Sequence, residues 1–192
     1  FQNRTTDRAN RLISQIFLYS NFVCLIFIVA HYYDFFNMSY RFTLITWALI
    51  VFFSITMYLF CKLNMNRTLT MYTGLFGVVT IISFMGTNSA IGVNISYAIA
   101  PLFSCMYLVK RYTIIASSAG YIGMIFSLFI KSQEMYLLDM TTDTPMDYFI
   151  PHLAGFSIEY IILLLACTSI TGILRQTVLE LQDRTERIRI MQ

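Results

Sequence analysis

Long apolar segments separated by short polar stretches occupy most of this chain. A helix needs ~20 mostly apolar residues to cross a bilayer, and segments of about this length lie at residues 12–32, 42–62, 68–87, 92–109, 112–131 and 149–174. They are continuously apolar and lack the alternation of barrel strands, so we expect helices. The sequence predicts an all-α fold, a polytopic membrane protein with a six-helix transmembrane bundle.

The composition excludes an ordinary soluble domain. Hydrophobic residues make up 57% of the chain and charged residues 12%, with a mean hydropathy of +0.65, whereas soluble domains carry ~25% charged residues. Membrane lipids are therefore the expected partners, and the net charge of +3 gives no reason to expect a nucleic-acid partner. The chain begins with Phe1 and reaches Gln192 within a polar helical pattern, so we expect a fragment of a longer protein.

The distribution of basic residues predicts the orientation of the helices. Eleven of the 13 Lys and Arg residues lie on one side of the predicted membrane, before the first segment or near the connections that follow the second, fourth and sixth. Only Arg41, after the first segment, and Lys131, at the end of the fifth, lie on the other side. Basic residues concentrate on the cytoplasmic side of a membrane, so both termini are expected to be cytoplasmic. The acidic Ser132–Tyr148 stretch then lies outside, as a solvated linker or, alternatively, as a lid or interfacial helix.

Three parts follow from this topology. We expect residues 1–11 to form a cytoplasmic N-terminal segment and residues 12–174 to form the six-span domain. Residues 175–192 are expected to form a cytoplasmic signalling helix that leads to an output domain beyond this sequence.

Patterns typical of enzymes and metal sites do not occur in the sequence. There is no Cys-x-x-Cys, His-Glu-x-x-His or Gly-x-Ser-x-Gly motif, and no Asp lies inside a predicted span. We therefore expect no catalytic residue, metal or cofactor in these residues.

Glu159 is the most costly polar residue to place in a bilayer. It lies well inside the last segment, roughly 15 Å from its outer end at ~1.5 Å per residue, and intramembrane acids are functional candidates by default. His152 lies two turns nearer the outer side on the same helix face. Two interpretations stay open: an outward-opening pocket in which both residues bind a ligand or sense protons, or a structural hydrogen bond from Glu159 to a Tyr, Ser or Asn of a neighbouring helix.

Segment 92–109 offers complementary polar groups. Pro101 has no N–H to donate to the carbonyl of Tyr97, so we expect a kink that frees this carbonyl. Asn94 lies one turn inside the outer surface. These residues predict a pocket shared with the last segment; the alternative is an ordinary proline kink satisfied by water or a neighbouring Ser.

The last apolar segment continues into a charged, amphipathic stretch without Pro or Gly after Gly172. Its apolar positions follow the alternating 3-4 step of a heptad repeat: Leu174, Val178, Leu181 and Ile188. This spacing predicts a parallel homodimer with a coiled-coil seam, although a surface amphipathic helix has the same pattern.

Residues 179–192 (Leu-Glu-Leu-Gln-Asp-Arg-Thr-Glu-Arg-Ile-Arg-Ile-Met-Gln) follow six short-looped spans. This architecture resembles the membrane input regions of bacterial receptors that precede diguanylate cyclase, HD-GYP phosphodiesterase, histidine kinase or class III cyclase domains. The resemblance implies a sensor in the bacterial inner membrane, in cyclic di-GMP, cyclic-nucleotide or kinase signalling, whose full-length protein is an enzyme. A small proton- or solute-coupled transporter or channel is the alternative; an intramembrane enzyme is disfavoured for want of paired catalytic groups.

Overall fold

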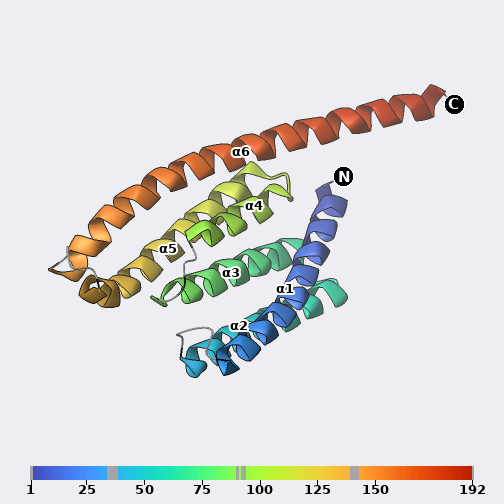
Figure 1. Ribbon diagram of the computed structural model, residues 1–192. Coiled ribbons are helices and arrows are strands. Elements are labelled where there is room, and N and C mark those ends of the chain that lie inside the picture. Colours follow the sequence, from blue (N-terminus) through green and yellow to red (C-terminus); the bar gives the residue numbers. More distant parts are fainter. Residues whose placement is uncertain (1, 34–38, 90, 92–93, 139–142, 192) are drawn as a thin grey trace.

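The computed structural model of the protein is helical throughout its elements (Figure 1). The structure describes residues 2–33, 39–89, 91, 94–138 and 143–191, and no strand occurs in these residues. The elements are α1 (Gln2–Tyr32), α2 (Tyr40–Lys62), α3 (Arg67–Gly86), the 3₁₀-helix η1 (Asn94–Ala98), α4 (Ile99–Cys105), α5 (Lys110–Leu138) and α6 (Pro145–Met191). The prediction of an all-α fold is confirmed.

Five of these helices contain a stretch long and apolar enough to cross a membrane: α1, α2, α3, α5 and α6. Membrane association, as predicted from the composition, is therefore supported by the helices themselves. The residues of the expected N-terminal segment belong to α1 from Gln2 onward, and those of the expected signalling helix belong to α6 as far as Met191.

The prediction of a single helix over residues 92–109 is wrong. The described part of this segment forms η1 and then α4, and the turn that follows contains Leu108 at a φ of 57°. Pro101 is the third residue of α4, in the first turn, where backbone N–H groups have no acceptor within the helix and proline is tolerated. The seven residues of α4 extend roughly 10 Å, about a third of the hydrocarbon core of a bilayer.

The expected outer loop, Ser132–Tyr148, is also largely helical. α5 continues to Leu138 and α6 begins at Pro145, while residues 139–142 of this prediction lie outside the described residues. Thr144 and Asp147 form a capping box, since the Thr144 amide donates to the Asp147 carboxylate at 2.9 Å and the Asp147 amide to the Thr144 hydroxyl at 3.4 Å. Local capping and the absence of Pro or Gly through Leu138 extend both helices beyond their apolar cores.

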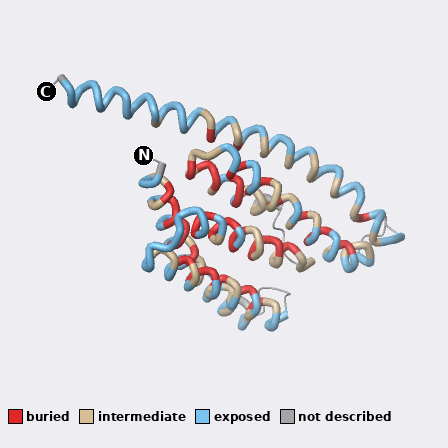
Figure 2. The backbone as a smooth tube through the Cα atoms, turned by 180° about the vertical axis from the view of Figure 1, so that it is seen from behind, coloured by how far each residue is buried: buried red, intermediate tan, exposed pale blue. Residues whose placement is uncertain are grey.

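The helices lie side by side in a layered arrangement (Figure 1). α6 lies along α5 and α4, α3 lies in the middle, and α1 and α2 form the opposite side. Both ends of the chain lie at the same end of the molecule, and α6 extends beyond the other helices there. Figure 2 shows that buried residues gather in the inner helices, whereas α6 is exposed along most of its length.

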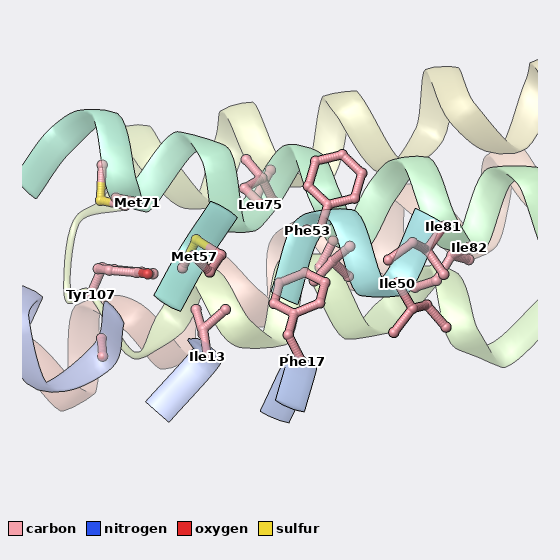
Figure 3. Packing of buried hydrophobic residues seen from close by; sticks show 14 of the residues in the cluster. Ile13, Phe17, Ile50, Phe53, Met57, Met71, Leu75, Ile81, Ile82 and Tyr107 are labelled. Atoms are coloured by element: carbon pink, nitrogen blue, oxygen red, sulfur yellow. The ribbon is translucent and has the colours of Figure 1, made fainter. Parts of the chain in front are cut away.

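The hydrophobic core lies mainly between α1, α2 and α3 (Figure 3) and reaches α4, the turn after it and α5 through Ala100, Tyr107, Tyr112 and Ala116. Phe17 and Phe53 stack at a ring distance of 6.2 Å, and the fully buried Met57 packs beside Ile13. Gly77 makes this approach possible, because a Cβ at this position would lie 2.7 Å from Cδ1 of Phe53 and 2.9 Å from Cζ of Phe17. Small residues that let helix backbones approach are a common basis of packing in membranes.

A buried polar network joins the ends of three segments near the N-terminus. Asn10 accepts a hydrogen bond from the Tyr107 hydroxyl at 2.7 Å and donates to the Arg67 carbonyl oxygen at 3.2 Å. The Arg67 guanidinium also pairs with Asp7 at 2.7 Å. These contacts fix the turn after α4 against the starts of α1 and α3, so the short α4 is held at the same end of the molecule as its longer neighbours.

Candidate ligand site between α4, α5 and α6

A cavity of about 400 Å³ lies between η1–α4, α5 and α6. Three residues singled out in the sequence line it together: Tyr97, Pro101 and Glu159. Its walls are otherwise mainly apolar and aromatic, with Met124 on α5 and Phe156 on α6 among them. Cavities of ~300–1,000 Å³ with apolar walls and a few polar groups are typical of small-molecule sites.

Glu159 is exposed on α6 at the edge of this cavity. Its carboxylate has no hydrogen bond or ion pair with any other described residue, and no basic residue lines the cavity. The alternative of a hydrogen bond to a neighbouring helix therefore finds no partner in the part of the chain that the structure describes. A carboxylate placed at bilayer depth costs several kcal/mol unless it is paired, solvated or protonated, and among the described residues no side chain offsets this cost at Glu159.

Two tyrosines of the lining are held by hydrogen bonds between α5 and α6. The Tyr121 hydroxyl lies 2.7 Å from Oγ of Ser157, and the Tyr160 hydroxyl lies 3.3 Å from Oγ of Ser118. Their rings stack at 4.2 Å with an interplanar angle of 19°. This aromatic pair gives the cavity a rigid wall next to the Glu159 carboxylate.

Ser117 contributes a polar group that sequence reasoning missed. The residue lines the cavity, is 1% exposed, and its hydroxyl has no hydrogen-bond partner among the described residues. A buried hydroxyl without a partner costs about 1–3 kcal/mol. One serine among several on α5 carries no distinguishing signal in the sequence, because only the packing shows which hydroxyls are satisfied.

The carbonyl oxygen of Tyr97, which the sequence singled out as a group freed by Pro101, lies against α5. A Cβ at Gly120 would lie 3.6 Å from this oxygen, which is ordinary van der Waals contact. Gly120 and the fully buried Ala116 therefore leave room on α5 for the junction at which η1 continues directly into α4. Pro101 is buried close to this junction rather than inside a long kinked helix.

His152 is not brought into the cavity by the described structure. His152 is exposed; its Nδ1 lies 2.7 Å from the Tyr148 carbonyl oxygen and its ring stacks on that of Tyr148 at 4.0 Å. It is not among the lining residues. Asn94 begins η1, and the placement of its side chain lies outside the described part of the structure.

α6 contacts the bundle from Phe149 as far as Gly172 and is mostly exposed beyond it. Thr113 and Thr171, both buried, are 3.0 Å apart through their hydroxyls, and Cys105 Sγ lies 3.5 Å from the Cys167 carbonyl oxygen. The predicted seam residues follow on this helix: Leu174, Leu181 and Ile188 are exposed and Val178 is half-buried.

Comparison with known proteins gives no match to a family model, to a curated protein or to a solved structure. Function is therefore argued from the chain itself. Among the described residues, no three His, Cys, Asp or Glu side chains lie close enough together to hold a metal ion.

Proposed function

We propose that this chain is the membrane sensory input domain of a bacterial signalling receptor. The observation that carries the proposal is the continuity of α6, one helix of 47 residues that forms a wall of the cavity and extends through the charged residues that follow Arg175. An occupant that contacts Phe156 or Glu159 contacts the same helix that leads away from the bundle. In this proposal a small ligand or proton is sensed in the cavity, and α6 transmits its effect to a cytoplasmic output domain.

The topology proposed for this receptor has six crossings, with η1–α4 and its flanking turns as the fourth. Basic residues support a common cytoplasmic end: Arg67 contacts Asp7 of α1, and the Lys110 side chain lies against Gly172 of α6. Lys131 lies elsewhere and donates to the Ile91 carbonyl at 3.2 Å. Such an asymmetry favours the basic end in the cytoplasm.

Reporter fusions test this topology in the bacterial inner membrane. Fusions after Arg67, Arg111 and Arg189 are expected to report cytoplasm, and a fusion after Asp143 is expected to report the outside. A cytoplasmic report at Asp143, or an outside report at Arg111, would overturn the six-crossing arrangement.

The proposed receptor is a parallel homodimer with a seam along the distal part of α6. One face of this part of α6 carries the apolar seam residues, Leu174, Val178, Leu181 and Ile188. The opposite face carries the ion pair between Asp183 and Arg187, whose charged groups are 2.8 Å apart. Exposed apolar positions at heptad spacing gain burial only when a second helix covers them.

Signal transmission is tested by joining residues 1–192 to the dimeric catalytic core of a histidine kinase. Insertions of one to seven residues after Arg175 rotate the output by about 100° per residue, so autophosphorylation is expected to vary with insertion length and to recover at seven. The same insertions placed after Asp143, outside the expected path of transmission, serve as the control. Activity that is independent of insertion length after Arg175 would exclude transmission through α6 and favour the transporter alternative.

A further inference from the structure

The cavity between α4, α5 and α6 contains an acid without a countercharge. Glu159 is the one acidic residue that lines it, and no Lys, Arg or His among the described lining residues can neutralise it. If the chain spans a bilayer as proposed above, Glu159 lies roughly 21 Å along α6 from Pro145 and roughly 24 Å from Arg175, at 1.5 Å per residue. A carboxylate this far from both helix ends is too short to reach bulk water.

The other groups of the cavity suit a cation with an apolar body. Tyr121 and Tyr160, whose rings stack on each other, line the same space as Glu159, and aromatic faces attract organic cations. The hydroxyls of Tyr121 and Tyr160 are already hydrogen-bonded, so their rings are held in place. The unpartnered, buried hydroxyl of Ser117 is available to a polar atom of a ligand.

From this combination we propose that the cavity binds a small amphiphilic organic cation, an ammonium group attached to an apolar or aromatic body. The ammonium lies against the Glu159 carboxylate and the tyrosine rings, and the body fills the apolar space toward Met124 and Pro101. The inference rests on the proposed sensory function only for the location of the cavity in the bilayer; it names the ligand class of that site.

The size of the cavity, about 400 Å³, matches a compact molecule. An ammonium group also occurs in lipid headgroups, but headgroups lie at the membrane surface, whereas Glu159 lies about midway between Pro145 and Arg175, the part of α6 proposed to cross the bilayer. The soluble amphiphile is therefore the source to which the proposal commits, and the choice of lipid in the experiment separates the two.

Benzyltrimethylammonium and its uncharged carbon isostere, neopentylbenzene, form a matched pair of probes. The chain is reconstituted in nanodiscs of an uncharged glycolipid, diglucosyldiacylglycerol, so that no surface charge attracts the probe. Binding of tritiated benzyltrimethylammonium is measured by scintillation proximity, with neopentylbenzene as competitor. Saturable binding that the neutral isostere does not displace at equal concentration is expected. Repeating the measurement with phosphatidylethanolamine nanodiscs is expected to leave the affinity unchanged; displacement by this lipid would overturn the assignment to a soluble ligand.

Variants localise the binding. Glu159→Gln removes the charge and keeps the shape, so we expect at least about tenfold weaker binding of the cation. Ser117→Ala is expected to change the affinity for this probe by less than about twofold, because a quaternary ammonium has no N–H and no lone pair for a hydrogen bond to the Ser117 hydroxyl. Glu134→Gln, an exposed acid of α5 that does not line the cavity, is the matched control and is expected to bind like the unmodified chain.

The outcomes separate this inference from the proposed function. Equal affinities of the unmodified chain and Glu159→Gln would overturn the cation site. If Glu159→Gln also changed the fraction of dimer, Glu159 would be assigned to contacts with a second copy of the chain. Because binding is measured without any output domain, cation binding that depends on Glu159 supports the site even where the kinase fusion shows no response. In that case only the sensory function fails.

Discussion

The two halves of the bundle use the same kind of helices in different ways. The helices α1, α2 and α3 pack closely against one another, and 56% of the residues in the apolar stretch of α3 are buried. In the apolar stretch of α6 only 6% of the residues are buried. The principal core contains residues from every helix of the first half but none of the described residues of α6. Lipid is as apolar as a protein core, so close packing rather than burial itself holds membrane helices together.

This difference indicates a division of roles. Gly77 and Met57 bring α1, α2 and α3 into close contact, whereas α6 packs along α5 on one side only, with polar pairs such as Tyr121–Ser157 and Thr113–Thr171, and is exposed on the other. A helix with little buried surface changes position at a lower cost than one embedded in a core. The first half is therefore expected to be the stable scaffold and the second the half that responds to a ligand.

The sharpest test compares the same substitution in the two halves. Gly77→Ala places a Cβ within 3.0 Å of the rings of Phe53 and Phe17, and overpacking of this kind is expected to lower the free energy of unfolding by about 2 kcal/mol. Gly155→Ala in α6 meets no atom within 4 Å and is expected to stabilise its helix by about 0.5–1 kcal/mol. Unfolding of each variant is followed in micelles against the unmodified chain.

If both glycine substitutions destabilise the protein equally, the contrast between scaffold and responsive half is wrong.

The polar network of the basic end gives a smaller effect. Tyr107→Phe removes the hydroxyl that donates to Asn10 and leaves this buried amide oxygen without its partner, so we expect a loss of about 1–2 kcal/mol in the free energy of unfolding. Tyr58→Phe, at an exposed tyrosine of α2, serves as the control and is expected to change it by less than about 0.5 kcal/mol. A neutral Tyr107→Phe would contradict the role of this network in holding the turn after α4.

Two serines of α5 are expected to respond with opposite signs. Ser117 and Ser127 are each 1% exposed. The Ser127 hydroxyl has the carbonyl oxygens of Ser83 and Gly123 as acceptors at 2.6 and 2.7 Å, whereas the Ser117 hydroxyl has no partner among the described residues. In the absence of ligand, Ser127→Ala is expected to lower the free energy of unfolding by about 1 kcal/mol, and Ser117→Ala to raise it by up to about 1 kcal/mol.

A loss of stability in Ser117→Ala comparable to that in Ser127→Ala would show that the Ser117 hydroxyl already has a hydrogen-bond partner, so that it is not available to a ligand.

The predicted dimer gives the smallest effect on stability and is better measured by rates. Single cysteines at Val178 and Leu181, in a background without native cysteines, are expected to cross-link across a two-fold axis much faster than one at Glu180. Full burial of such side chains contributes about 1.5–3 kcal/mol each, so the seam assists a dimer rather than holding it alone. Equal rates at all three positions would remove the coiled-coil hypothesis.

Local features of the sequence predicted the helices and many of their ends. The apolar segments predicted six membrane-length helices, and five of the described helices are long and apolar enough, because hydropathy and helix length are properties of a contiguous stretch. The start of α6 and the position of Pro101 in α4 also have local causes, a capping box at Thr144 and Asp147 in the first case and a proline in the first turn in the second. Apolar length alone misplaced these helix ends, because it predicted a loop over residues 132–148 and one helix over residues 92–109. Local chemistry at a helix end outweighs the average hydropathy of the segment.

The tertiary structure decided which polar residues share a site. Sequence spacing puts His152 and Glu159 on one face of α6, yet only Glu159 lines the cavity, because the opposing wall is the short η1–α4 rather than a full-length helix. The Tyr121–Tyr160 pair and the unpartnered Ser117 depend on how α5 and α6 are rotated against each other. Periodicity determines which residues share one helix face, but contacts between helices determine what that face meets.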